Sequence, residues 1–264
     1  MTTIRHLNIE VTRRCDQHCT YCFNDSGPAA RHPEMTIDKW LAFIRHMSLR
    51  GLRSLHITGG EPFASSATVP VLREAQSLGL STSILSNGLR IPTVAEQEPV
   101  LLRNLSVAQI SLDSMDPSVH DLRRGKSGAW KQALLAMDAL RELRVPLEVS
   151  CTVDEENLGH AYELAAFARS IGASLILRPL LPLGRASFAS SRQARVPTAP
   201  GTDSFADVLV RDRFRYLPDG PRSDRDALDS GILTILPDGR FRAGFISASG
   251  PCVGSSAVEV LEAA

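Results

Sequence analysis

Three cysteines near the N-terminus have the spacing most suggestive of chemistry in this sequence. Cys15, Cys19 and Cys22 form a C-x3-C-x2-C pattern. Three thiolates on one loop can hold three irons of a [4Fe–4S] cluster and leave the fourth iron without a protein ligand. A structural zinc site would need a fourth ligand, and His18 would have to supply it with strained geometry from between two ligating neighbours. We therefore predict an iron–sulfur cluster at these cysteines.

The composition narrows the class of protein that surrounds this motif. The 264 residues are 43% hydrophobic, which is enough for a sizeable core. Lys and Arg total 29, as do Asp and Glu, so the chain lacks the basic field of a nucleic-acid-binding protein. No apolar run approaches the roughly 18 residues of a membrane span, and the first ten residues lack the apolar stretch of a secretory signal. We expect a cytoplasmic protein that binds neither nucleic acid nor membrane.

Short apolar runs alternate with amphipathic stretches through the first two thirds of the chain. The predicted strands are His6–Val11, Ser54–Thr58, Ser81–Leu85, Ala108–Leu112, Leu147–Val153 and Ser174–Leu177. The predicted helices are Ile37–Ser48, Val69–Gly79, Trp130–Leu143 and Leu158–Gly172. Strands joined by helical crossovers predict an α/β fold with a parallel sheet, either open and doubly wound or barrel-like, with too few units for an eight-fold barrel.

The pattern changes in the last third of the chain. Ala186–Asp203 is rich in Ser, Ala, Pro and Arg and has no sustained period, as expected for a linker or mobile loop. Ile232–Leu236 and Arg240–Ile246 flank a Pro-Asp-Gly turn and predict a β-hairpin, and Ser256–Glu262 predicts a short helix. We expect three parts: residues 1–185, 186–230 and 231–264.

Several motifs together make the chain resemble the radical S-adenosylmethionine (SAM) superfamily from about Ile4 to Arg185. Tyr21, the residue before the third cysteine, is aromatic as in that family, and Gly59-Gly60-Glu61-Pro62 is similar to its GGEP element. The other matching segments follow the later predicted strands: Ser86-Asn87-Gly88, Ser111-Leu112-Asp113, Arg123-Arg124-Gly125, Ser150–Val153, Asn157 and Arg178–Arg185. Ligand sites of α/β proteins lie at these carboxyl ends.

The resemblance implies a partial (β/α)6 TIM-like barrel with a small C-terminal β-hairpin and helix cap. It also implies one [4Fe–4S] cluster and SAM as cofactors, with an electron donor such as flavodoxin or ferredoxin. Glu61 is expected to bind the SAM ammonium, and Arg124 to lie near the SAM carboxylate. The full set of implied SAM-binding residues is Tyr21, Gly59, Gly60, Glu61, Asn87, Ser111, Arg124, Ser150 and Arg178.

The C-terminal segment resembles a degenerate SPASM or twitch region, which in related enzymes holds additional clusters. Outside the first motif only Cys151 and Cys252 remain, too few for a second cubane, so we predict a single cluster. Without a second cluster to accept electrons, a redox-neutral reaction is favoured. Cys252 lies in the turn Ser249–Gly254 and is either a hydrogen-donating catalytic thiol or a small core residue. The same resemblance places Ser150 on the inward side of its strand, so Cys151, which points the other way, is expected in the core.

A thiol that returns hydrogen to the face opposite the adenosyl group inverts the carbon. The overall pattern is similar to the aminoglycoside epimerases, so the leading hypothesis is an epimerase of a small natural product such as a polycationic aminosugar. Aspartates could bind such a cation, or could belong to a solvated loop together with neighbouring arginines. These aspartates are Asp203, Asp207, Asp212, Asp219, Asp224, Asp226 and Asp229.

Three alternative functions remain open on the sequence. One is a redox-neutral mutase, dehydratase or carbon–carbon-cleaving enzyme in which Cys252 is structural. Another is peptide modification, with Ala186–Thr202 helping to dock a leader. The third is a noncatalytic iron–sulfur carrier or sensor, and the Gly59–Glu61 element counts against it, because a carrier needs no site for the SAM amine.

Overall fold

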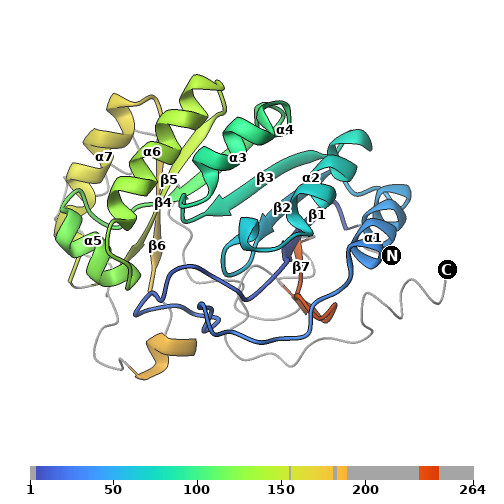
Figure 1. Cartoon of the computed structure of the whole chain (residues 1–264), viewed down its shortest axis with the longest axis horizontal. Coiled ribbons are helices and arrows are strands. Elements are labelled where there is room, and N and C mark those ends of the chain that lie inside the picture. Colours follow the sequence, from blue (N-terminus) through green and yellow to red (C-terminus); the bar gives the residue numbers. More distant parts are fainter. Residues whose placement is uncertain (1–3, 155, 181–182, 189–231, 244–264) are drawn as a thin grey trace, which may run out of the picture.

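The computed structural model describes residues 4–154, 156–180, 183–188 and 232–243, and its main feature is a curved sheet of six parallel strands (Figure 1). Neighbours follow one another in the order β6-β5-β4-β3-β2-β1, and β6 does not pair with β1, so the barrel is partial. The predicted α/β fold is therefore confirmed. The six strands are β1 (His6–Glu10), β2 (Ser54–Thr58), β3 (Ser81–Ser86), β4 (Val107–Ser111), β5 (Leu147–Val153) and β6 (Ser174–Pro179).

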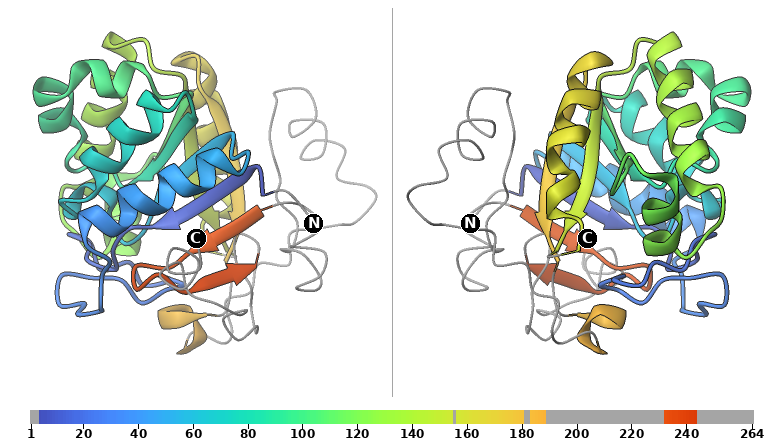
Figure 2. Two further views of the ribbon diagram at one scale, coloured as in Figure 1. Left: turned by 90° about the vertical axis from the view of Figure 1, so that its right-hand side faces the viewer. Right: turned by 90° about the vertical axis from the view of Figure 1, so that its left-hand side faces the viewer.

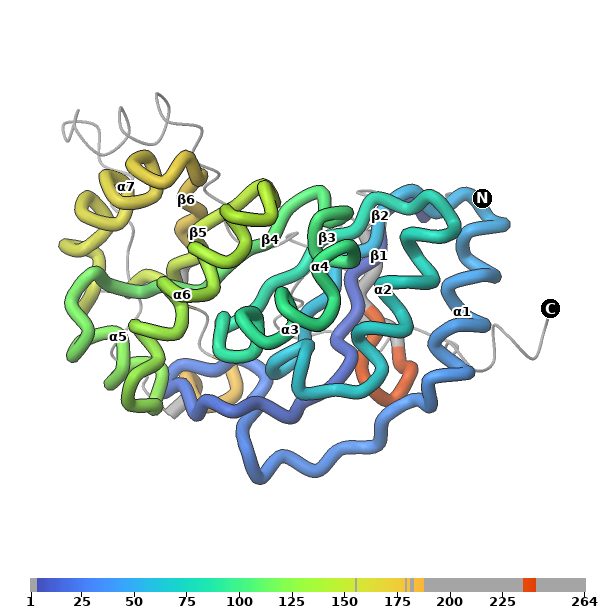
Figure 3. The backbone as a smooth tube through the Cα atoms, turned by 45° about the horizontal axis from the view of Figure 1, so that its top comes forward, coloured from blue at the N-terminus to red at the C-terminus, as the bar shows by residue number. Residues whose placement is uncertain are grey.

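The helices lie on one outer face of this sheet (Figure 3). The α-helices are α1 (Ile37–Leu49), α2 (Thr68–Ser77), α3 (Ile91–Gln97), α4 (Pro99–Arg103), α5 (Pro117–Arg124), α6 (Ala129–Glu142) and α7 (Ala161–Ser170). Short 3₁₀ turns are η1 (Pro62–Ala64), η2 (Leu158–His160) and η3 (Gly184–Phe188). The predicted helix Leu158–Gly172 divides into η2 and α7, and η3 begins just before the expected linker and ends inside it. None of the described helices combines the length and apolarity needed to cross a membrane.

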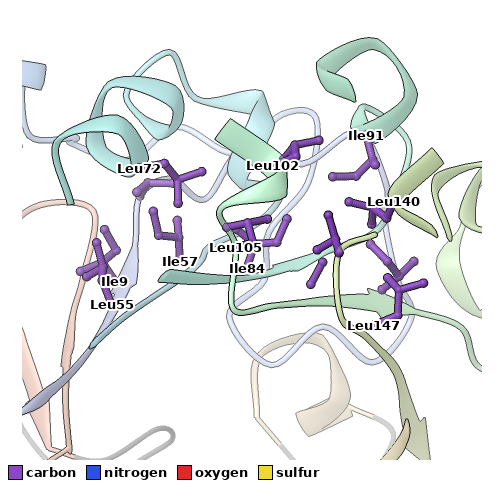
Figure 4. Packing of buried hydrophobic residues seen from close by; sticks show 14 of the residues in the cluster. Ile9, Leu55, Ile57, Leu72, Ile84, Ile91, Leu102, Leu105, Leu140 and Leu147 are labelled. Carbon is purple, nitrogen blue, oxygen red and sulfur yellow. The ribbon is translucent and has the colours of Figure 1, made fainter. Parts of the chain in front are cut away.

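Alternation along the strands separates an apolar face from a polar one. Ile9, Ile57 and Ile84 are fully buried and pack beneath the helices, where they meet residues such as Leu72 and Leu140 (Figure 4). Because neighbouring side chains on a strand point to opposite faces, the residues between them face the inside of the partial barrel. The polar face of the sheet is thus available for a ligand site.

The predicted C-terminal hairpin is present as β7 (Ile232–Ile235) and β8 (Phe241–Ala243), which pair antiparallel. Its attachment was not predicted: β7 pairs in parallel with β1 and extends the sheet on that side (Figure 2). The backbone N–H of Met35 also donates to the carbonyl of Pro237 at 2.7 Å. The predicted helix at Ser256–Glu262 lies outside the described residues, and the three domain boundaries stay predictions.

Candidate functional site

A cavity of about 170 Å³ opens at the carboxyl ends of the strands. It is lined by the three predicted cluster ligands, Cys15, Cys19 and Cys22. Most of the predicted SAM-binding residues also line it, namely Tyr21, Gly59, Gly60, Asn87, Ser111, Arg124, Ser150 and Arg178. Residues from all six parallel strands or the loops that follow them therefore meet at one site.

We call the segment between β1 and α1, residues 11–36, the cysteine loop, because it carries Cys15, Cys19 and Cys22. The Gly59-Gly60 turn after β2 is hydrogen-bonded directly to the start of this loop. The N–H of Gly60 donates to Thr12 O at 2.7 Å, and the N–H of Glu61 donates to Arg14 O at 2.9 Å. A Cβ on Gly60 would lie 2.3 Å from Arg14 O, and one on Gly59 would lie 2.6 Å from Thr12 O. The sequence hypothesis gave these glycines a role in approaching SAM, and the structure shows that they also allow two backbones to meet.

The end of α5 holds the middle of the cysteine loop in the same way. The N–H groups of His18 and Thr20 donate to the carbonyls of Arg124 and Arg123 at 3.1 and 2.9 Å. Gly125 ends the helix in the left-handed conformation, with φ +59°, and a Cβ there would lie 2.4 Å from His18 O. A side chain at this position is excluded by both conformation and contact.

The segment after β6 holds the end of the cysteine loop. The Arg185 N–H donates to Cys22 O at 3.0 Å, and its Nε donates to Cys19 O at 2.8 Å. Gly184 has φ +56°, and a Cβ there would lie 2.4 Å from Phe23 O. Two of the three cysteines are thus fixed through their own carbonyl groups.

The surroundings of the thiols fit a cluster with sulfur acceptors. Gln17 Nε2 and Asn24 Nδ2 line the cavity, are buried and have no hydrogen-bond partner among the described residues. Such amide donors can bind the sulfur atoms of an iron–sulfur cluster. No three His, Cys, Asp or Glu side chains of the described ranges converge on a point that would hold a single metal ion. Burial raises the pKa of the Cys15 thiol to about 12, so cluster binding must displace a proton.

Glu61 lies behind the cavity wall and is not one of its lining residues. Its fully buried carboxylate accepts from Ser86 Oγ at 2.9 Å, Asn87 N at 2.8 Å and Phe63 N at 3.2 Å. Burial raises its pKa to about 7, against the opposing effect of these hydrogen bonds. In the structure Glu61 ties the turn after β2 to the end of β3, and its contact with the SAM ammonium stays a prediction.

Arg124 is part of a buried charge network and is already paired. Its Nε lies 2.9 Å from Asp113 Oδ2, and its guanidinium lies 5.5 Å from the centre of the Tyr21 ring. The Tyr21 hydroxyl donates to the same carboxylate. Burial acts to raise the pKa of Asp113, but Arg124 and Arg123 outweigh it and the pKa is lowered. The expected role of Arg124 at the SAM carboxylate stays a prediction.

Arg178 presents a less compensated positive charge to the cavity. The partners of its guanidinium among the described residues are neutral, namely the hydroxyl of Ser150 and Gln109 Oε1, the latter at 2.8 Å. Burial lowers its pKa to about 10, partly offset by Glu148. Because no carboxylate among the described residues contacts this charge, Arg178 suits an anionic ligand group better than Arg124 does.

The structure brings two further polar residues of β1 to the cavity that the sequence hypothesis did not include. Asn8 and Glu10 line it, together with Thr58 and Thr152. The sequence could have indicated both residues. Polar residues alternate with apolar ones along β1, and a parallel strand that is buried on both faces is ordinarily apolar throughout. Cys151 is fully buried in the core, as predicted, and Cys252 lies outside the described residues.

Most of the chain that forms this site matches one protein family. Residues 9–168 match the model of the radical SAM superfamily, which is more than half of the chain. The chain belongs to that superfamily. Its cofactors are accordingly a [4Fe–4S] cluster and SAM, and the cysteine loop and the cavity beside it supply the residues that would hold them.

Individual relatives cover different shares of the chain. The sporulation killing factor maturation protein SkfB of Bacillus subtilis is 28% identical over 68% of this chain and 43% of its own length. A PqqA peptide cyclase of Streptomyces rochei is 25% identical over 88% of this chain and 66% of its own length. The crystal structure of Streptococcus suis SuiB has a TM-score of 0.71 and 14% identity, over 99% of this chain and 65% of that one. This radical SAM chain therefore spans about half to two thirds of such relatives.

Because the Gly59-Gly60 turn packs so closely against the cysteine loop, we expect a side chain at Gly60 to reduce the amount of cluster that the chain binds. Gly60→Ala should displace the loop at Arg14, because the new methyl group has no room there. After anaerobic reconstitution, the wild type should hold about four irons per chain and the variant less than half of that. Gly159→Ala is the matched control, since a Cβ at Gly159 meets nothing within 4 Å. Equal iron content in the wild type and Gly60→Ala would contradict the role given to this turn.

Because Glu61 joins the turn after β2 to the end of β3, we also expect its removal to lower the stability of the fold. In Glu61→Ala, two N–H groups and one hydroxyl lose their shared acceptor, which should lower the free energy of unfolding by about 1–3 kcal/mol. Anaerobic denaturant unfolding measures this loss, and equilibrium SAM binding measures the ammonium contact expected from the motif. Unchanged stability together with weakened SAM binding would show that the ligand contact, not the tie to β3, is the role of Glu61.

Proposed function

We propose that this radical SAM enzyme inverts one carbon centre of an amine-bearing natural product such as an aminoglycoside. When bound, the cluster and SAM supply a 5′-deoxyadenosyl radical that abstracts a hydrogen atom from the substrate. The chain orients the substrate in the polar cavity and keeps water from the radical. It then returns a hydrogen atom from a thiol on the opposite face of the carbon.

The burial of Cys151 is the observation that supports this proposal. Cys151 is one of two cysteines outside the cluster loop, and it is exposed neither to solvent nor to the cavity. Its thiol contacts Asn157 Nδ2 at 3.5 Å and the carbonyl of Asp113 at 3.7 Å, within the core. Cys252 is then the one remaining thiol of the sequence for hydrogen return.

The atoms and electrons of this reaction balance with one external reductant. The substrate C–H hydrogen ends in 5′-deoxyadenosine, and the S–H hydrogen of Cys252 ends on the inverted carbon. The sulfur is left as a thiyl radical, which needs one electron and one proton to become a thiol again. A cytoplasmic donor such as flavodoxin or ferredoxin supplies that electron as well as the one that SAM cleavage requires.

Peptide modification is the second candidate, and the relatives favour it. SkfB is named a maturation protein and the Streptomyces rochei relative a peptide cyclase. For this chain the corresponding proposal is that Ala186–Thr202 docks a leader peptide. A substrate panel that contains both aminoglycosides and peptides distinguishes the two candidates.

The thiol mechanism predicts where solvent hydrogen enters the product. In deuterated water the wild type should place one deuterium at the inverted carbon and form about one 5′-deoxyadenosine per product. Cys252→Ala should still form 5′-deoxyadenosine but give little inverted product. Cys151→Ala is the matched control and should keep inversion, because Cys151 does not line the cavity. Mass spectrometry measures both products, and full inversion by Cys252→Ala would refute the mechanism.

A further inference from the structure

Each of the three thiols in the cysteine loop has a side-chain carboxamide within hydrogen-bonding distance of its sulfur. The pairs are Cys15 with Asn87, Cys19 with Gln17 and Cys22 with Asn24, at distances of 3.7, 3.7 and 3.1 Å. All three carboxamide residues line the cavity together with the thiols, and none is more than 7% exposed. Buried amide groups are therefore among the nearest neighbours of the three sulfur atoms.

The carboxamide of Asn87 has a fixed orientation. Its Oδ1 accepts from the N–H of Leu89 at 2.9 Å, and its Nδ2 donates to Asp16 Oδ1 at 2.8 Å. These two contacts turn the amide nitrogen toward the sulfur of Cys15. Asn87 thus presents a donor to this sulfur whether or not iron is bound.

Gln17 and Asn24 have the opposite orientation. Their carbonyl oxygens accept from the thiols of Cys19 and Cys22, while Gln17 Nε2 and Asn24 Nδ2 are buried and have no hydrogen-bond partner among the described residues. This arrangement suits free thiols, which have a hydrogen to donate. A cysteine bound to iron is a thiolate, which only accepts. The oxygens would then face an acceptor, and the buried N–H groups would still lack one, which is costly.

We propose that Gln17 and Asn24 donate N–H hydrogen bonds to the cysteine sulfurs when the cluster is bound. Each amide donates to the sulfur that its oxygen contacts in the free protein. A half-turn about the last side-chain bond exchanges the oxygen and nitrogen of a carboxamide with almost no change of shape. For Asn24 the neighbouring hydroxyl of Ser26, which donates to Oδ1 at 2.7 Å, can accept from Nδ2 after that turn.

These hydrogen bonds make the bound cluster easier to reduce. Reduction adds one electron, which an external low-potential donor supplies, and part of the added negative charge lies on the sulfurs. An N–H donor stabilises the more negative state more strongly and so raises the reduction potential. The inference depends on the family assignment but not on the proposed epimerase reaction, because the cluster must be reduced whatever the substrate is.

Anaerobic redox titration of the cluster-loaded protein, followed by the EPR signal of the reduced cluster, tests the proposal. Gln17→Met and Asn24→Leu keep the approximate side-chain volume and remove the donor. Each should lower the ratio of reduced to oxidised cluster about 3- to 10-fold at a given potential, and a 10-fold change is about 59 mV for one electron. Unchanged potentials in both variants at wild-type iron content would overturn the proposal.

Gln76→Met is the matched control for these variants. Gln76 Nε2 donates to Thr82 Oγ1 at 3.1 Å and to Leu101 O at 3.0 Å, and Gln76 does not line the cavity. The same substitution there also removes buried amide hydrogen bonds, so it should reduce stability and leave the reduction potential unchanged. A shift of the potential in Gln76→Met as large as that in Gln17→Met would show that general loosening of the fold causes the effect, and the proposal would be wrong.

A measurement on the wild type tests the Gln17 contact even if the variants bind too little iron to titrate. Gln17 is the only glutamine among the described residues that line the cavity. Cell-free synthesis can introduce ¹⁵N at the side-chain amide of glutamine alone. Pulsed EPR of the reduced cluster without SAM should then show a ¹⁵N hyperfine coupling, because the labelled nitrogen is hydrogen-bonded to a cluster sulfur. Absence of this coupling would contradict the proposed contact.

Discussion

The shape of the cysteine loop depends on backbone contacts with three other parts of the chain. Between β1 and α1 the loop has no helix, and its regular pairing is one isolated bridge between Arg14 and Gly27. The contacts come from the turn after β2, the end of α5 and the segment after β6, and each includes a glycine where a Cβ would collide with the loop backbone. The sheet therefore sets the positions of the three thiols, even though no strand carries them.

Arg123 and Arg124 connect this loop to the sheet in two ways at once. Their carbonyl groups accept hydrogen bonds from the loop, while their guanidinium groups pair with Asp154 and Asp113. Buried ion pairs contribute little net stability, but removing one partner leaves an uncompensated charge. A shift of α5 away from the sheet would break these ion pairs and is therefore unfavourable. The cysteine loop, which is hydrogen-bonded to α5, is held in place by the same network.

The sequence predicted the parts of the fold that have strong local patterns. The bounds of β2 and β5 agree with prediction, because apolar alternation and clear turn residues mark them. The helices α3 to α5 were missed, because they are short and each has a proline near its start. The pairing of β7 with β1 joins segments far apart in the chain, which local patterns do not record. Motifs likewise identified Glu61 as important but did not show that its carboxylate faces Ser86 and Asn87.

The pairing of β7 also affects what β1 can do. With β2 on one side and β7 on the other, β1 is an internal strand whose backbone groups are paired, so the directions of Asn8 and Glu10 follow from strand alternation. β1 then continues directly into the cysteine loop, and Glu10 precedes Cys15 by five residues. The polar side chains that β1 contributes to the cavity are therefore positioned by the same stretch of backbone that positions the first predicted cluster ligand. Such a connection favours a fixed distance between this wall of the cavity and the cysteine loop.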